Sequence, residues 1–286
     1  MKPIIVFFFT LLSLSLLHIK GFQMNNNNKI TRSNRPLILV TNDDGINAQG
    51  IKSLTQYLLP LGDVVVVAPD SARSGQSAAI TVNVPLRMAQ VDEQPGYKAF
   101  KTTGTPVDCI KLALNVLFAD MPDLIVSGIN HGSNSGVSVV YSGTMGAVFE
   151  GTIQSIPSIG FSLCNFAPDA DFSICREVVE TLCRRALEKG MPEGMGLNVN
   201  IPATDSLNGM KVCRAARGKW TGEYDSRIDP FGRPYHWLTG YFENAEPDAP
   251  DTDEYCLAHN YASIVPVSPD RSLVGIDNRI DEWLAD

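Results

Sequence analysis

Two neighbouring aspartates, Asp43 and Asp44, have the residue types and spacing best suited to chemistry in this sequence. They stand in the segment 41–45, TNDDG, directly after an apolar run. Adjacent carboxylates repel each other unless a cation is present, and hard oxygen ligands suit Mg²⁺, Mn²⁺ or Ca²⁺. A plain turn is the alternative, because Asn, Asp and Gly also favour turn geometry. This short segment alone leaves both interpretations open.

Two more polar segments follow apolar runs in the same way. Residues 70–77, DSARSGQS, include Ser74 and Gly75, which could complete a metal shell or cradle a phosphate. Residues 127–134, SGINHGSN, include Asn130, whose amide oxygen could bind a metal. Taken alone, each segment also fits a polar surface loop or a helix cap. A lone histidine such as His131 is more often a hydrogen-bonded bystander than a catalytic acid or base.

A fourth polar segment opens a predicted helix. Residues 141–144 read YSGT, and apolar residues at helical spacing follow to about residue 153. Hydroxyl groups and free backbone N–H groups at a helix N-terminus bind phosphate well. Ser142, Gly143 and Thr144 are therefore candidate phosphate contacts, together with Asn42 and Gly75.

The segments around these residues alternate between two patterns. Apolar runs at 37–40, 64–67 and 124–126 predict strands buried on both faces. Helical spacing of apolar residues at 51–58, 107–117 and 172–186 predicts helices between strands. This alternation predicts a Rossmann-like α/β fold, with a mostly parallel sheet and helices on both faces. Because parallel strands end at one edge of the sheet, the polar segments should meet there.

The second half of the chain has a different pattern. From residue 210 to about 265 it is rich in aromatic residues, Gly and Pro, and it shows little helical spacing. We predict a β-rich extension of hairpins on a single domain spanning 37–286. A late strand is expected at 261–267, and a short last helix near 280–283.

Composition and charge limit the possible functions. Apolar residues make up 44% of the 286 residues, which is enough to offset the conformational entropy of folding. The formal net charge is −8, and no run of five or more basic residues occurs. Such a surface repels a phosphate backbone, so we predict no binding of DNA or RNA polymers. A small anionic substrate remains possible where a bound metal reverses the local charge.

Residues 1–36 are predicted to be a leader and polar spacer outside the domain. Lys2 precedes an apolar stretch, 4–17, that resembles a signal peptide but lacks a clear cleavage site. Alternatively, translation begins at Met24 and gives a cytoplasmic protein. The six scattered cysteines are typical of reduced thiols and favour the cytoplasm, with export as the alternative. We expect no stable membrane association of the mature chain.

The ordered set of motifs resembles the SurE family of metal-dependent acid phosphatases. The matching segments are 38–51 (ILVTNDDGINAQGI), 66–77 (VVAPDSARSGQS), 104–109 (GTPVDC), 126–136 (VSGINHGSNSG), 141–151 (YSGTMGAVFEG), 197–202 (LNVNIP), 227–240 (RIDPFGRPYHWLTG) and 251–267 (DTDEYCLAHNYASIVPV). Any single motif is weak, whereas the ordered set is highly specific. His131 stands where relatives often have Ala, and Ser71-Ala72 replaces a more polar pair. Both departures concern substrate preference.

The resemblance implies a site, a reaction and an assembly. Asp43, Asp44, Ser74 and Asn130 match the family's ligands for one Mg²⁺ or Mn²⁺ per subunit. The implied reaction is hydrolysis of nucleoside 5′-monophosphates, and also of 3′-monophosphates and short polyphosphate. Either aspartate could take a proton from the attacking water. The resemblance also implies a homodimer or homotetramer assembled through the C-terminal β extension.

Two other classes of protein also place acids after a first strand. Phosphatases that form an aspartyl-phosphate usually need Asp-x-Asp there, whereas Asp43 and Asp44 are adjacent. Phospho-acceptor signalling modules need a further Asp and a Lys at later strand ends, and they are less than half this length. Stable phosphorylation of an aspartate would favour either alternative.

Overall fold

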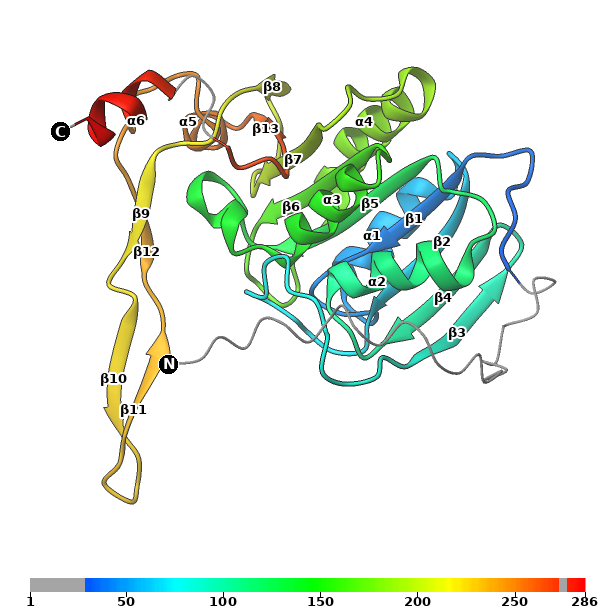
Figure 1. Ribbon diagram of the computed structural model, residues 1–286, viewed down its shortest axis with the longest axis horizontal. Coiled ribbons are helices and arrows are strands. Elements are labelled where there is room, and N and C mark those ends of the chain that lie inside the picture. Colours follow the sequence, from blue (N-terminus) through cyan, green and yellow to red (C-terminus); the bar gives the residue numbers. More distant parts are fainter. Residues whose placement is uncertain (1–28, 273–276, 286) are drawn as a thin grey trace.

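A nine-stranded sheet organises the protein in this computed structural model, which describes residues 29–272 and 277–285 (Figure 1). Its strand order is β3-β4-β2-β1-β5-β6-β7-β13-β8. The six strands from β4 to β7 are parallel to one another. At the two sides of this set, β3 pairs antiparallel with β4 and β13 pairs antiparallel with β7, and β8 lies parallel to β13. The strands are β1 (Leu37–Thr41), β2 (Asp63–Pro69), β3 (Met88–Gln94), β4 (Tyr97–Thr102), β5 (Leu124–His131), β6 (Ser158–Cys164), β7 (Gly196–Pro202), β8 (Met210–Val212) and β13 (Ala262–Val267).

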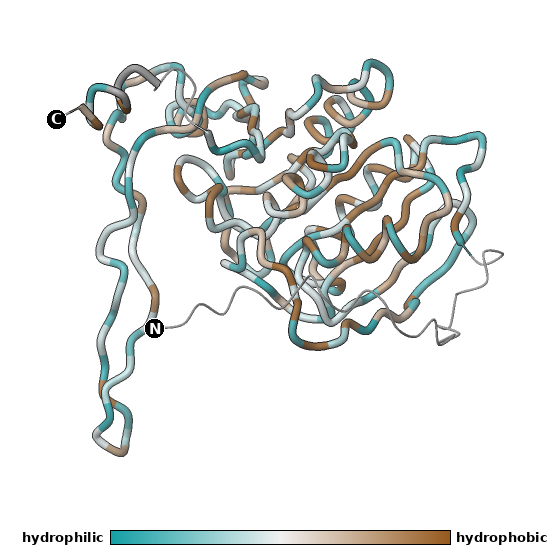
Figure 2. Tube along the Cα trace, viewed as in Figure 1, coloured by the Kyte–Doolittle hydropathy of each residue, from teal (hydrophilic) through white to brown (hydrophobic). Residues whose placement is uncertain are grey.

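Helices cover both faces of the sheet because the central strands are apolar on both sides. Ile38 and Val40 of β1 belong to a core with α1 (Gln49–Leu58) and α4 (Arg176–Lys189). Leu37 and Leu39 belong to a second core with α2 (Pro106–Leu112) and α3 (Gly143–Ile153). The hydrophobic residues lie along these strands and helices in Figure 2. The predicted fold class is confirmed.

The strand order places a topological switch point at β1. The chain passes from β1 through α1 to β2 on one side, and β5 lies on the other side of β1. A point where successive connections leave a strand in opposite directions is the usual ligand site of an open α/β sheet. The segments that follow β1 and β5 are those that contain Asp43, Asp44 and Asn130.

A two-stranded arm projects far from the sheet (Figure 1). It pairs β9 (Gly218–Thr221) with β12 (Tyr241–Asn244), and β10 (Tyr224–Ile228) with β11 (Pro234–Leu238). Large apolar side chains on it, including Trp237 and Leu238, are exposed to solvent. The predicted β-hairpin extension is confirmed, and its use in oligomerisation stays a prediction.

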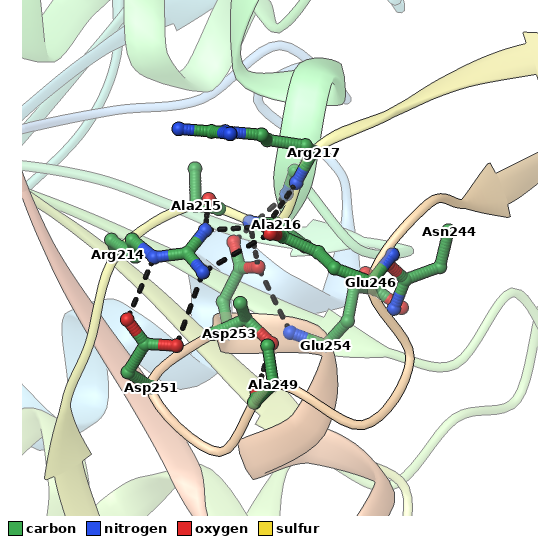
Figure 3. Close-up of polar contacts among 12 residues, drawn as sticks. Arg214, Ala215, Ala216, Arg217, Asn244, Glu246, Ala249, Asp251, Asp253 and Glu254 are labelled. Atoms are coloured by element: carbon green, nitrogen blue, oxygen red, sulfur yellow. Dashed lines mark hydrogen bonds and ion pairs between the residues drawn. The ribbon is translucent and has the colours of Figure 1, made fainter.

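Charged side chains fasten the root of this arm to the domain (Figure 3). The Arg214 guanidinium binds the carboxylates of Asp251, at 2.8 and 3.1 Å, and of Glu246. The buried Asp253 carboxylate accepts the backbone N–H groups of Ala216 and Gly136, both at 2.8 Å. Asp253 begins the short helix α5 (Asp253–Ala258), which the sequence pattern did not predict.

The two ends of the described chain are an irregular N-terminal segment and a C-terminal helix. Residues 29–36 run along the domain: Ile30 forms a bridge with Phe118, and Arg35 pairs with Asp63 at 3.3 Å. The signal-like stretch and Met24 lie outside the described residues. The helix α6 (Asp277–Leu284) agrees with the predicted last helix. Within 29–272 and 277–285, none of the helices has both the length and the apolarity that crossing a bilayer requires.

Candidate active site

The turn after β1 is held by the side chain of Asn42. Its Nδ2 donates to the Gly45 carbonyl at 3.0 Å, and its Oδ1 accepts the Gly45 N–H at 3.2 Å. Asn42 is fully buried, and Gly45 has a φ of +95°, which only glycine adopts readily. The structure therefore gives Asn42 a role in shaping the turn that presents Asp43 and Asp44. A direct contact between Asn42 and substrate stays a prediction.

Asp43 is a buried carboxylate bound to the start of α3. Its Oδ1 accepts the Thr144 hydroxyl at 2.6 Å. Burial, with a smaller contribution from the nearby charge of Asp44, raises the pKa of Asp43 from 3.8 to about 6 against the opposing effect of the Thr144 hydrogen bond. The ionised form of Asp43 is therefore costly unless a positive charge compensates it.

Asp44 lies closer to solvent and faces the end of β5. Its Oδ2 accepts the His131 backbone N–H at 3.3 Å, which opposes the rise in the Asp44 pKa that burial causes. The His131 ring itself packs edge-on against Phe172, with ring centroids 4.8 Å apart. His131 therefore acts on Asp44 through its backbone N–H, and the charge of its imidazole also opposes the rise in the Asp44 pKa.

Asn130 also lies at the end of β5, on the strand next to β1. Its Nδ2 donates to the carbonyls of His131, at 3.3 Å, and Gly132, at 2.9 Å. These bonds fix the orientation of the amide. Because oxygen and nitrogen lie on opposite sides of an amide group, the Oδ1 is directed away from those carbonyls and can act as a ligand.

The loop after β2 is bound to both Asp43 and the segment before α3. The Arg73 backbone N–H donates to the Asp43 carbonyl at 2.6 Å, and the Ser77 hydroxyl donates to the Val140 carbonyl at 2.6 Å. Ser74 and Gly75 lie between these two attachments, and both are exposed. A Cβ placed on Gly75 would meet no atom within 4 Å, so the backbone there is open to a ligand.

The N-terminus of α3 faces Asp43. The Ser142 hydroxyl caps the helix by accepting the Met145 N–H at 3.1 Å. A Cβ on Gly143 would lie 2.9 Å from Asp43 Oδ2, so only glycine allows this close approach. The side chains of Ser142 and Thr144 are thus used within the protein. The first backbone N–H groups of a helix have no partner within it. That of Thr144 interacts with the Asp43 carboxylate, which leaves that of Gly143 for an anion.

The residues brought together suit a hard divalent cation. Among the described residues, no Lys, Arg or His side chain forms an ion pair with Asp43 or Asp44, although both carboxylates are largely buried. No group of three or more His, Cys, Asp or Glu side chains in the described ranges could hold a metal. A metal at this acid pair would therefore rely also on neutral oxygens, such as those of Ser74 and Asn130, or on water.

Fold and site together define a class: an α/β protein whose acid pair and helix N-terminus meet at the carboxyl edge of a parallel sheet. The family model described as Survival protein SurE matches residues 38–222. The chain belongs to the SurE family. The predicted resemblance is confirmed.

Relatives of known name cover nearly the whole described chain. A protein of Phocaeicola vulgatus named 5′-nucleotidase SurE is 45% identical over 252 residues, which are 88% of this chain and 98% of that protein. A protein of the same name from Cytophaga hutchinsonii is 48% identical, over 87% of this chain and 97% of the relative. Their name matches the predicted enzyme class, a phosphatase-type hydrolase.

A solved structure agrees with the fold. The crystal structure of the Sure protein from Aquifex aeolicus superimposes with a TM-score of 0.75 at 34% sequence identity. The match covers 87% of this chain and all of that one.

Two contacts of the site were missed at the level of sequence. These are the hydroxyl bond of Thr144 to Asp43 and the backbone bond of Arg73 to Asp43. Both join segments far apart in sequence, and no local pattern encodes them. Only the rule that strand ends converge could have suggested that these segments meet.

Proposed function

We propose that this protein is a divalent-metal-dependent 5′-nucleotidase that hydrolyses nucleoside monophosphates to nucleoside and phosphate. The observation that carries the proposal is the close approach of the buried Asp43 carboxylate to the N-terminus of α3. An anion-binding helix end beside two carboxylates suits a phosphate ester bridged by a cation. The name of the curated relatives supports the substrate class.

Asp43, Asp44, Ser74 and Asn130 would hold one Mg²⁺ or Mn²⁺ per subunit. When bound, the cation supplies positive charge that neutralises the phosphate and lowers the pKa of a nearby water. The raised pKa values of both aspartates support this assignment, because a cation offsets the cost of ionising them.

The chain's own groups supply the remaining functions. The backbone N–H group of Gly143 donates to a phosphate oxygen and stabilises the charge that develops on it. Asp43 or Asp44 accepts the proton of the attacking water. Gly75 lets the phosphate approach the backbone of its loop closely.

The wider proposal includes further substrates and an assembly. Nucleoside 3′-monophosphates and short polyphosphate present the same kind of terminal phosphate. Exposed apolar side chains along the arm support a homodimer or homotetramer that covers them. The net charge of −8 supports small nucleotides rather than DNA or RNA polymers as partners. All six cysteines are free thiols, which supports a cytoplasmic location.

Phosphate release tests this function. The full-length protein is treated with a chelator, and hydrolysis of 5′-AMP, 3′-AMP and tripolyphosphate is measured before and after adding Mg²⁺ or Mn²⁺. We expect release from 5′-AMP only after metal is added. Hydrolysis that is insensitive to the chelator would overturn the role of the metal, and folded protein that releases no phosphate would overturn the activity.

A further inference from the structure

An exposed aromatic ring lies beside the candidate active site and has no role in the chemistry described above. Phe166 follows β6 at the carboxyl edge of the sheet, and 77% of its surface is exposed. A phenyl ring this exposed lacks the stabilisation that burial would give it. Single exposed apolar residues are common, so the exposure of Phe166 becomes significant only through its position beside the site.

The ring of Phe166 rests on the backbone of Gly132. A Cβ on Gly132 would lie 2.1 Å from Cε1 and 2.5 Å from Cζ of the ring, so any other residue would displace it. The Gly132 N–H donates to the Leu163 carbonyl at 2.8 Å, which joins this segment to the end of β6. The Gly132 carbonyl accepts the Asn130 amide at 2.9 Å. The ring is therefore seated two residues from a proposed metal ligand.

A polar hollow of about 520 Å³ lies at the same edge, at the ends of β6 and β7. Its lining includes Asn165, Asp171, Ser173, Thr204 and Asp205, and it contains no Lys or Arg. Hydrogen bonds from Ser173, at 2.6 and 2.8 Å, lower the pKa of Asp171 and keep it ionised. A lining of carboxylates and hydroxyls suits sugar hydroxyl groups and repels a second phosphate.

The hollow is connected to the acid pair through packed residues. Phe172 stands between Asp171 and Ser173 in the chain, and its ring contacts the ring of His131. The His131 N–H in turn binds Asp44 at 3.3 Å. The His131 ring is packed against Phe172, whereas the ring of Phe166 is open to a ligand.

We propose that Phe166 stacks on the base of the bound nucleotide, with the adjacent hollow receiving its ribose, so that Phe166 determines preference for nucleotides over simpler phosphate esters. The inference rests on the proposed nucleotidase function. It concerns recognition of the base and ribose, which lie outside the phosphate site. Base–aromatic stacking tolerates every base, because each base has a π-face. The preference is therefore for the presence of a base rather than for one particular base.

The test compares 5′-AMP with ribose 5-phosphate, which has the same phosphate and sugar but no base. For full-length Phe166→Ala, kcat/KM for 5′-AMP should fall roughly 10- to 100-fold, mainly through KM, as expected from loss of one stacked base. For ribose 5-phosphate it should change less than about twofold, because no stacking is lost. Phe166→Trp keeps an aromatic face and should stay close to wild type with both esters.

Ile153→Ala is the matched control, because Ile153 is a large exposed apolar residue at the far end of α3. It should leave both esters unaffected. An equal loss for both esters in Phe166→Ala would overturn the proposal and assign Phe166 a structural role. Unchanged 5′-AMP kinetics would also overturn it and would favour a second copy of the chain as the group that covers the ring. Wild-type protein that hydrolyses both esters equally well overturns the stacking alone, whereas protein that hydrolyses neither overturns the nucleotidase function as well.

Discussion

The hydroxyl of Thr144 weakens the hold of the buried Asp43 carboxyl on its proton. It donates to Asp43 at 2.6 Å and opposes the effect of burial, which raises the pKa of this carboxyl to a net value of about 6. In Thr144→Val this bond is lost, the pKa of Asp43 rises further, and the carboxylate binds a cation less well. We expect Mn²⁺ affinity near pH 6 to fall roughly 3- to 10-fold, the equivalent of about 1 kcal/mol for one hydrogen bond.

Calorimetric titration of metal-free protein with Mn²⁺ measures this effect. The control is Thr152→Val, because Thr152 is a buried threonine of the same helix whose hydroxyl donates to the Val148 carbonyl at 2.8 Å, away from the acid pair. It should bind Mn²⁺ like wild type. Equal affinities in wild type and Thr144→Val would contradict the proposed link between Thr144 and the metal.

The raised pKa of Asp43 leads to a prediction of how metal affinity depends on pH. In the metal-free protein the pKa of Asp43 is about 6, above its ordinary value of 3.8. Below pH 6 the cation must displace a proton from Asp43, so affinity should fall by up to about tenfold for each pH unit. Above about pH 7 the carboxyl is ionised and affinity should level off. Titrations with Mn²⁺ from pH 5 to 8 check this, and a constant affinity across that range would refute it.

The helices and strands were easier to predict from the sequence than the side-chain contacts. The apolar runs at 37–40, 64–67 and 124–126 correspond to β1, β2 and β5, because strands buried on both faces must be apolar throughout. The convergence of strand ends then places Asp43, Asp44 and Asn130 together. The helix α5 escaped prediction because six residues are too few to reveal helical spacing. The sequence left open whether the segment around Asn42 forms a plain turn or a ligand site, and the structure shows that Asn42 holds the turn through Gly45.

The packing of α1 on β5 depends on Gly50. A Cβ at this position would lie 1.9 Å from the Ile129 carbonyl oxygen, so Gly50→Ala requires the backbone to move. Alanine favours a helix over glycine by about 1 kcal/mol, but overpacking a tight contact typically costs about 1–3 kcal/mol. Because a separation of 1.9 Å is far shorter than any van der Waals contact, we expect the overpacking to outweigh the gain in helix propensity. We predict a net loss of stability of about 2 kcal/mol.

Urea denaturation measures the stability of Gly50→Ala. Lys52→Ala serves as the control, because Lys52 is exposed on the same helix. Its effect should stay within about 0.5 kcal/mol. A stabilised Gly50→Ala protein would show that helix propensity outweighs the contact with β5.

At the scale of the whole molecule, the arm is the feature that a lone domain does not explain. Its exposed apolar residues include Trp237, 60% exposed, and an isolated two-stranded ribbon is only marginally stable in water. Cross-strand pairing joins Thr221 to Tyr241, so a two-residue Asn-Gly turn can replace residues 222–240. We expect the shortened protein to form a smaller assembly than wild type, while its domain stays folded.

Light scattering after size exclusion measures the mass of the assembly. Lys219→Ala is a suitable control, because it changes an exposed polar residue of the arm and keeps the apolar ones. It should leave the mass unchanged. A shortened arm with the wild-type mass would place the subunit interface elsewhere.

The central claim is that Asp43 and Asp44 hold the metal on which phosphate release depends. The most direct measurement is the rate of phosphate release from 5′-AMP by Asp44→Asn at saturating Mg²⁺ or Mn²⁺, beside wild type and Asp248→Asn, which alters an exposed carboxylate outside the site. We predict a loss of roughly 10²- to 10⁴-fold in Asp44→Asn, in the range seen when a group acting in proton transfer is removed. Asp248→Asn should keep the wild-type rate. Full activity in Asp44→Asn with an unchanged requirement for metal would contradict the account.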